Sequence, residues 1–241
     1  MLFDRLPQYR AAIMETKIFS WLGREFVEIV GEARGGAPVD TATAELFQKL
    51  ADALGPLGLS LDNTARIRVF GRDRQARTDA TAARSKILSG NRRAASSSFI
   101  SRDWFDADGG AGLELLAMRP RHKAAERKPV DFDPARNYLC YLDYDSVLFY
   151  SGFTSEAATL EQQVREVLVT LDGAWTRAKT DWSKVVKLSL FLRRGSNVES
   201  VQQILAEAGR LSLPEVEFTF VDGFAGEKYL VEIEATALKN P

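Results

Sequence analysis

The sequence predicts an α+β fold built from two tandem units, each with the element order ββαβαββ. The first observation is the stretch from Asp181 to Arg193, in which apolar and polar residues alternate as in a strand with one buried face. The second is a shorter echo of this stretch at Leu61 to Arg72, where Val69 stands 121 residues before Leu190. The same offset recurs along the chain, so we expect a duplicated unit rather than one large domain.

The first unit, assigned to residues 1–120, begins with a predicted hairpin. Its two strands, Lys17 to Leu22 and Glu25 to Val30, are joined through a Gly-Arg turn. A helix follows from about Asp40, because apolar residues recur there with spacings of four, three and four. The inner stripe of this helix is Thr43, Phe47, Leu50 and Leu54. The remaining predicted elements are the strand with Ile67 and Val69, a helix from Arg74 to Leu88, and strands at Ser96–Ser101 and Leu113–Met118.

The same pattern returns after a predicted linker at residues 121–134, so the second unit is assigned to residues 135–241. A hairpin of Asn137–Leu142 and Val147–Ser151 leads into a helix whose stripe stands 121 residues after that of the first unit. This stripe consists of Val164, Leu168, Leu171 and Trp175. Ser196 and Glu199 predict a capping box at the start of the next helix. The last predicted strands are Glu217–Val221 and Tyr229–Ala237.

Both helices of a unit are expected on one face of a mixed sheet, because strand–helix–strand crossovers are right-handed. The other face then carries Arg66, Arg68 and Phe70 in the first unit, and Lys187, Ser189 and Phe191 in the second. A sheet with aromatic residues on its open face usually packs on another sheet. We therefore expect the two units to pack together or the chain to oligomerise.

Composition predicts a soluble cytoplasmic protein that does not bind a membrane. Hydrophobic residues make up 45% and charged residues 27% of the chain, and no apolar run reaches the length of a membrane span. Charged residues near the N-terminus argue against a signal peptide. The single Cys140 excludes an intrachain disulfide and is expected to be a core residue, and the single His122 excludes a multi-histidine metal site.

The net charge of -1 hides a basic segment. From Asp62 to Lys128 there are fifteen Lys and Arg against eight Asp and Glu, an excess of seven. This excess indicates either an anionic partner of the first unit or neutralisation of one unit by the other, and the second interpretation is favoured.

Four motifs in the second half resemble the Rid/YjgF family of reactive-intermediate deaminases, which is also called endoribonuclease L-PSP-like. They are DYDSVLFYSGFTS, EQQVREVLVTLDGAW, DWSKVVKLSLFLR and YLVEIEATAL, and together they span most of residues 130–240. The first half is similar only through the repeat, so the chain resembles a divergent tandem duplication. The resemblance implies chorismate-mutase-like units, a homo-oligomer with a trimer favoured, and small-molecule sites in clefts between units. It also implies hydrolysis of 2-imino acids or enamines to 2-oxo acids and ammonia, without metal or organic cofactor.

The resemblance places an arginine that grips the substrate carboxylate directly after a Pro-Ala pair. In this chain the corresponding stretch PEV puts Val216 there, and the repeat offset lands on Ala95 or Ser96 in the first unit. Arg92 and Arg93 lie just upstream and are the candidate ligand-binding substitutes, because a guanidinium can bind both oxygens of a carboxylate. The alternative is that both are solvated or paired with acidic residues of the other unit.

Three candidate catalytic residues follow from the same resemblance. Tyr138 has the spacing of the family's cleft tyrosine, Ser151 stands at the place of its cleft serine, and Glu234 at that of its C-terminal glutamate. The hydroxyls could bind a ligand or a water, and a desolvated carboxyl could transfer a proton to a leaving amine. The structural alternatives are a strand aromatic, a residue before a turn glycine, and an ion pair across an interface.

The first unit is expected to lack the glutamate. Laying LELLAM over VEIEAT pairs Glu114 with Glu232 and puts Leu116 at the position of Glu234.

The leading functional hypothesis is a divergent tandem Rid-like protein that binds a small metabolite in an inter-unit cleft. It would hydrolyse an imine or enamine, or catalyse a related cofactor-free reaction, with an altered substrate because the family arginine is absent. The second hypothesis is a non-catalytic ligand-binding or scaffolding pseudoenzyme. Binding or cleavage of nucleic acid is disfavoured, because few aromatic residues are interleaved with the basic segment.

Overall fold

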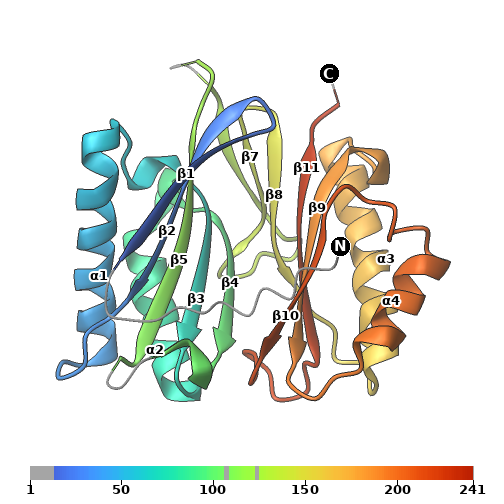
Figure 1. Cartoon of the computed structure of the whole chain (residues 1–241). Helices are drawn as coiled ribbons and strands as arrows, with labels where there is room; N and C mark the ends of the chain where they lie inside the picture. The colour runs from blue at the N-terminus through green and yellow to red at the C-terminus, as the bar shows by residue number, and fades with distance from the viewer. Residues whose placement is uncertain (1–13, 106–108, 123–124, 241) are drawn as a thin grey trace.

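The computed structural model describes residues 14–105, 109–122 and 125–240. Two mixed sheets lie in the middle of the molecule and pairs of helices cover their outer faces (Figure 1). The predicted α+β class with two tandem units is therefore confirmed. No helix in these ranges is long and apolar enough to cross a membrane.

The first unit is a five-stranded sheet in the order β1-β2-β5-β3-β4. Only β3 and β4 run parallel, as expected when a helix connects neighbouring strands. The predicted stripe of the first helix is buried against this sheet. The elements are β1 (Glu15–Trp21), β2 (Arg24–Glu32), α1 (Val39–Leu54), β3 (Thr64–Gly71), α2 (Arg74–Ile87), β4 (Ala95–Ile100) and β5 (Ala111–Arg119).

The second unit repeats this topology in the order β10-β9-β11-β8-β7 and adds β6 at the edge. β6 falls inside the segment expected to be a linker and pairs antiparallel with β7. Cys140 is buried in the core, as expected. The elements are β6 (Arg127–Asp131), β7 (Leu139–Tyr144), β8 (Val147–Phe153), α3 (Leu160–Ala178), β9 (Val185–Arg193), α4 (Val198–Glu207), β10 (Val216–Val221) and β11 (Val231–Leu238).

The predicted capping box of α4 is wrong by one residue. Asn197, not Ser196, is the N-cap, and its side chain accepts a hydrogen bond from the backbone N–H of Ser200. Asparagine is as good an N-cap as serine, so the helix start is satisfied one residue later than expected.

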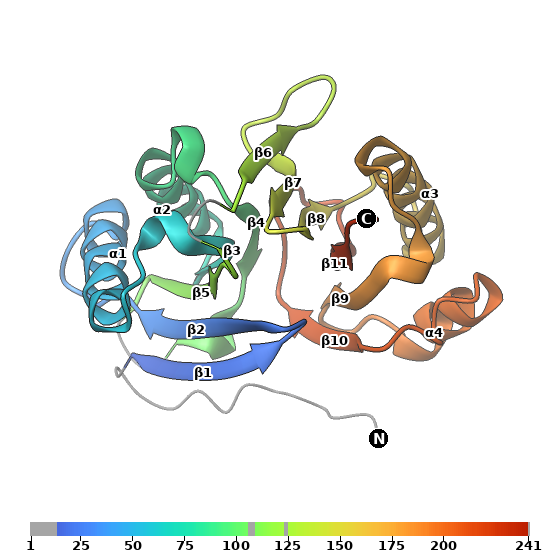
Figure 2. The same cartoon turned by 90° about the horizontal axis from the view of Figure 1, so that it is seen from above.

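The helix-free faces of the two sheets pack against each other, as Figure 2 shows from above. Two aromatic clusters fill this interface. One contains Phe26, Met118, Leu142, Tyr144 and Phe149, and the other contains Phe70, Phe99, Trp104, Phe191 and Phe224. Equivalent positions of the two units meet here. The Nε atom of Arg24 lies 2.9 Å from Asp145, which is 121 residues further on.

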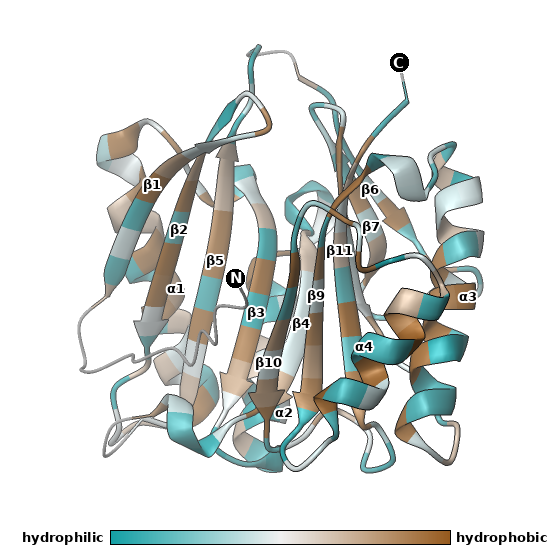
Figure 3. Cartoon of the chain, turned by 45° about the vertical axis from the view of Figure 1, so that its right-hand side comes forward, coloured by the Kyte–Doolittle hydropathy of each residue, from teal (hydrophilic) through white to brown (hydrophobic). Residues whose placement is uncertain are grey.

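Ion pairs form a polar layer within this interface, and hydrophilic segments interrupt β3, β5 and β11 in Figure 3. Arg68 lies 2.7 Å from Glu234 of the other unit and 2.5 Å from Glu114 of its own. Arg66 donates to the backbone carbonyl of Ala235 at 2.7 Å. The basic segment of the first unit is thus neutralised in part by the second, which is the interpretation favoured from the sequence.

The edge of β4 docks on the second unit and opens a cleft beside it. The backbone N–H of Ser96 donates to the Oγ of Ser151 at 3.0 Å, and that of Ile100 donates to the carbonyl of Gly223 at 2.8 Å. These contacts hold α2 of the first unit opposite β7, β8 and β11 of the second.

Candidate functional site

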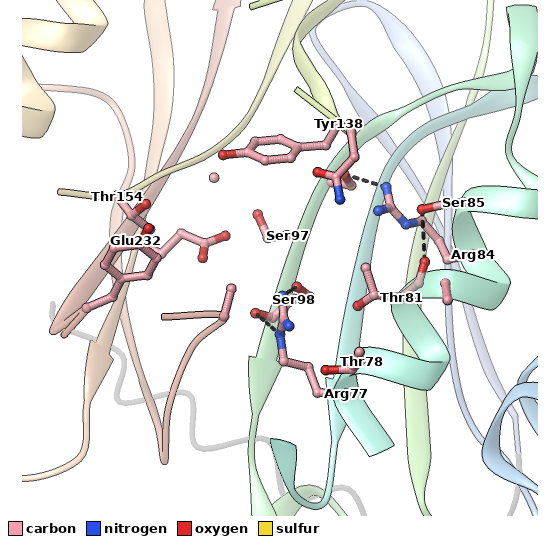
Figure 4. Close-up of a pocket in the computed structure, with 16 residues that line it drawn as sticks. Arg77, Thr78, Thr81, Arg84, Ser85, Ser97, Ser98, Tyr138, Thr154 and Glu232 are labelled. Atoms are coloured by element: carbon pink, nitrogen blue, oxygen red, sulfur yellow. Dashed lines mark hydrogen bonds between the residues drawn. The ribbon is translucent and has the colours of Figure 1, made fainter. Parts of the chain in front are cut away.

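A cavity of about 410 Å³ lies between α2 and β4 of the first unit and the second unit. Figure 4 shows its polar walls, with Arg77 and Arg84 on one side and Tyr138 and Glu232 on the other. Because one chain supplies both walls, no second copy is needed to complete the cavity. Its remaining polar lining includes Thr78, Thr81, Ser85, Ser97, Ser98 and Thr154.

Arg84 is a buried cation without a protein counterion. Its residue is 8% exposed, its Nη1 donates to the Oγ of Ser96 at 2.7 Å, and its Nε has no hydrogen-bond partner. Within the described residues no carboxylate comes within 4 Å of it. Burial, together with repulsion from Arg77 and Arg93, lowers the pKa of the Arg84 guanidinium to about 10. It stays charged near pH 7, and an uncompensated buried charge points to a missing anion.

Arg77 stands two helical turns before Arg84 on the same side of α2. Its guanidinium donates to the carbonyl and the hydroxyl of Ser98. Burial lowers the pKa of Arg77, and the nearby Glu232 opposes this change. The two arginines therefore form a cationic wall that is anchored on the alternating serines of β4.

Glu232 faces this wall from β11 and is 6% exposed. Burial first, and then repulsion from Glu234, raises the pKa of the Glu232 carboxyl to about 8. Glu232 therefore carries a proton near pH 7 and can act as a general acid. It folds over Gly152, where an added Cβ would lie 1.8 Å from Oε1. A glycine at this position of β8 leaves the room that the carboxyl occupies.

Tyr138 forms the roof of the cavity in Figure 4. Its hydroxyl accepts a hydrogen bond from Nη1 of Arg136 at 2.9 Å. Burial raises the pKa of Tyr138, so the phenol stays neutral and can still donate a hydrogen bond. Of the three residues expected to be catalytic, Tyr138 is the one whose side chain is placed in the cavity.

Glu234 does not line the cavity, in contrast to the expectation. It is fully buried in the interface, where burial would raise its pKa but Arg68 and Arg66 lower it below the usual value. Side chains two apart on a strand share a face, so Glu232 and Glu234 both point away from the helices. Only Glu232 reaches the cleft, because β11 begins beside the cavity and runs from there into the ionic layer.

The other three candidates have structural partners. Ser151 is fully buried and accepts the hydrogen bond from Ser96 described above, next to the cavity-lining Gly152. Arg92 is paired with Asp62 at 2.7 Å on the surface. Arg93 is paired with Asp131 and lines a smaller cavity of about 110 Å³ that also contacts Arg84 and Tyr138. Its ion pair with the other unit is the alternative that the sequence left open.

Strand register corrects the alignment of the two units. Arg68 pairs with Glu114, and Ser189, which is 121 residues later, pairs with Glu234. Glu114 is therefore the counterpart of Glu234, and Gly112 is the counterpart of Glu232. The direct overlay of LELLAM on VEIEAT, which pairs Glu114 with Glu232, is therefore two residues out.

The equivalent cleft of the first unit is filled by aromatic side chains. An added Cβ on Gly112 would lie 2.0 Å from Nε1 of Trp104. The Trp104 ring stacks on Phe70 with ring centroids 3.7 Å apart. The first unit therefore lacks both a counterpart of Glu232 and the open space that surrounds Glu232 in the second unit. In the part of the chain that is described, no cluster of His, Cys, Asp or Glu is arranged to hold a metal ion.

Comparisons with known proteins agree with this architecture. Residues 129–239 match the family model described as Endoribonuclease L-PSP, which confirms the resemblance seen in the second half. A search of the curated proteins found no match. A solved chorismatase is similar in fold over both units, with a TM-score of 0.61, 16% identity, and coverage of 92% of this chain and 79% of that chain.

Single-unit structures align with about half of this chain. A YjgF/YER057c/UK114 family member from Mycobacterium tuberculosis has 24% identity and a TM-score of 0.42, with coverage of 47% of this chain and 99% of its own. A YjgF family protein from Neisseria meningitidis has 19% identity and a TM-score of 0.42, with coverage of 48% of this chain and 97% of its own.

Proposed function

We propose, from the premise that residues 129–239 match the Endoribonuclease L-PSP family, that the inter-unit cleft binds a small carboxylate. The protein would hydrolyse an imine or enamine next to that carboxylate without a cofactor. The observation that carries the proposal is the buried Arg84, which has no carboxylate partner, in the same cavity as the buried carboxyl of Glu232.

Arg84 takes the role of the missing family arginine. Strand register makes Ser96 the counterpart of Val216, because Ser96 pairs with Ile67 and Val216 with Leu188. Arg84 reaches Ser96 from α2, so its guanidinium lies beside the position where that arginine is expected. A substrate carboxylate would accept hydrogen bonds from its free N–H groups and supply the missing negative charge.

Glu232 supplies the proton for the chemical step. With an enamine acid, its carboxyl proton passes to the terminal carbon of the C=C bond and leaves an iminium ion. The ionised Glu232 then accepts a proton from water as the water oxygen bonds to the iminium carbon. Glu232 then gives its proton to the amine nitrogen of this adduct and takes the hydroxyl proton as the C–N bond breaks. Enamine and water thus become a 2-oxo acid and ammonia, and Glu232 is again protonated. Tyr138 can hydrogen-bond to the water or the leaving amine.

The test is turnover of 2-aminoacrylate generated in solution, followed as pyruvate and ammonia. We expect turnover by the wild-type chain, loss on Glu232→Gln and on Arg84→Met, and no change on Arg92→Met, whose side chain pairs with Asp62 at the surface. Absence of turnover on a panel of imino and enamine acids would refute the proposal. In that case measurable binding of a 2-oxo acid would favour a non-catalytic ligand-binding role.

A second candidate reaction is hydrolysis of an enol ether. The observation that favours it is the fold likeness to a chorismatase over both units. Protonation of a C=C carbon beside a carboxylate is the same first step, so Glu232 would keep its role. Chorismate therefore belongs in the substrate panel, and a product that appears with chorismate but not with enamines would select this candidate.

A further inference from the structure

The lining of the cavity contains two guanidiniums without a protein counterion, although a ligand with a single carboxylate would need only one. Neither Arg77 nor Arg84 has a carboxylate within 4 Å among the described residues. The facing carboxyl, Glu232, makes no ion pair with either guanidinium, and burial raises its pKa to about 8. The cavity therefore presents two guanidiniums without a carboxylate partner, of which Arg84 is buried and Arg77 half-buried.

The two guanidiniums are held apart at fixed positions. Seven residues separate Arg77 from Arg84, which is about 10.5 Å along a helix axis. Their partners on β4 are two residues apart, at about 6.6 Å, so the guanidiniums converge towards the strand. Two carboxylates joined by a short carbon chain match this spacing, with one carboxylate at each guanidinium.

We infer that the ligand of this cleft is a dicarboxylate, with one carboxylate bound by Arg84 and the second bound by Arg77. The hydroxyls of Thr78 and Thr81 lie along α2 between the two cations and suit polar groups of the same ligand. The inference rests on the proposed function for the location of the site, and it adds the charge and the length of the substrate.

The test compares binding of simple acids by calorimetry at pH 7. The probes are α,ω-dicarboxylates from succinate to pimelate and the monocarboxylates of equal chain length. We expect one dicarboxylate to bind about 10- to 100-fold more tightly than its monocarboxylate, the gain from one additional charged hydrogen-bonded pair. Arg77→Met should abolish this preference, because the dicarboxylate then binds no more tightly than its monocarboxylate, whereas Arg84→Met should weaken both ligands.

Arg77→Gln serves as a second variant and should behave as Arg77→Met does, and thermal unfolding confirms that each variant is folded. Equal affinity of the wild-type chain for both kinds of acid would overturn the inference, as would a dicarboxylate preference that survives both Arg77 substitutions. These outcomes are separate from the proposed function. Hydrolysis of a monocarboxylic enamine without dicarboxylate preference leaves the function standing alone, and dicarboxylate preference without any turnover leaves the inference standing alone.

Discussion

Arg84 donates a hydrogen bond to the Oγ of Ser96 at 2.7 Å, and strand register makes Ser96 the counterpart of Val216, where the family resemblance implies an arginine. Helix α2 thus brings a guanidinium to a position of β4 that carries a hydroxyl. This wall of the cleft is therefore cationic although its strand has no arginine there.

Substitution of Arg84 by methionine should weaken carboxylate binding without lowering the stability of the fold. Methionine fills a similar volume without charge, so it removes the cost of burying an unpaired guanidinium. We expect carboxylate affinity to fall about 10- to 100-fold, whereas the free energy of unfolding stays unchanged or increases. Calorimetry and urea unfolding measure the two quantities. A marked loss of stability would show that Arg84 has a structural role.

The activity should depend on a proton held by Glu232. Its pKa of about 8 predicts that the rate is high while the carboxyl is protonated and falls as the pH rises through about 8. Glu232→Gln should lower kcat by about 10²- to 10⁴-fold, the usual contribution of a general acid, and remove this alkaline limb. The pH profile of kcat/KM is the measurement, and an unchanged limb in the variant would assign it to another group.

Glu234 should influence the same alkaline limb of the pH profile, although it lies outside the cavity. Neutralising it in Glu234→Gln removes a repulsive charge two residues from Glu232, so the limb should move to lower pH. The variant should also lose about 3–5 kcal/mol of stability, because Arg66 and Arg68 lose their buried partner. Glu217→Gln is the matched control, since Glu217 contacts Arg68 at 3.7 Å from β10 and lies outside the cavity lining. A shift in Glu217→Gln as large as that in Glu234→Gln would contradict the assignment.

Gly152→Ala should disable the site while the fold survives. The new methyl group would overlap Glu232 Oε1 and force the carboxyl out of position, at a cost of about 1–3 kcal/mol. We expect a loss of kcat similar to that of Glu232→Gln. Gly173→Ala is the control, because nothing lies within 4 Å of its added Cβ on α3 and alanine favours a helix. Wild-type activity in Gly152→Ala would show that Glu232 is not held as described.

Each chain should bind one ligand. The equivalent cleft of the first unit has Gly112 in place of the glutamate and is filled by Trp104. Titration calorimetry should therefore give one site per chain. Two equivalent sites would mean that the second cleft opens in solution.

The sequence predicted the repeat and the element order because periodic apolar residues report directly on buried faces. Tyr138 was expected in a cleft from the family resemblance, and its side chain does line the cavity, whereas its catalytic role stays a prediction. Glu232 was missed in favour of Glu234, since both residues share a face and only the direction of β11 decides which one reaches the cleft. Arg77 and Arg84 were missed because the cavity lies between the two units, and its lining depends on packing between residues far apart in the sequence. The available signal was their spacing of seven residues, which places both arginines on the same side of the predicted helix.

The most direct test of the central claim is a crystal structure with a small carboxylate, such as pyruvate, bound. It should show the ligand in the inter-unit cleft, with its carboxylate hydrogen-bonded to Arg84 and its reactive carbon facing Glu232. A ligand held instead by Arg92 or Arg93, or an Arg84 already paired with a protein carboxylate, would contradict the account.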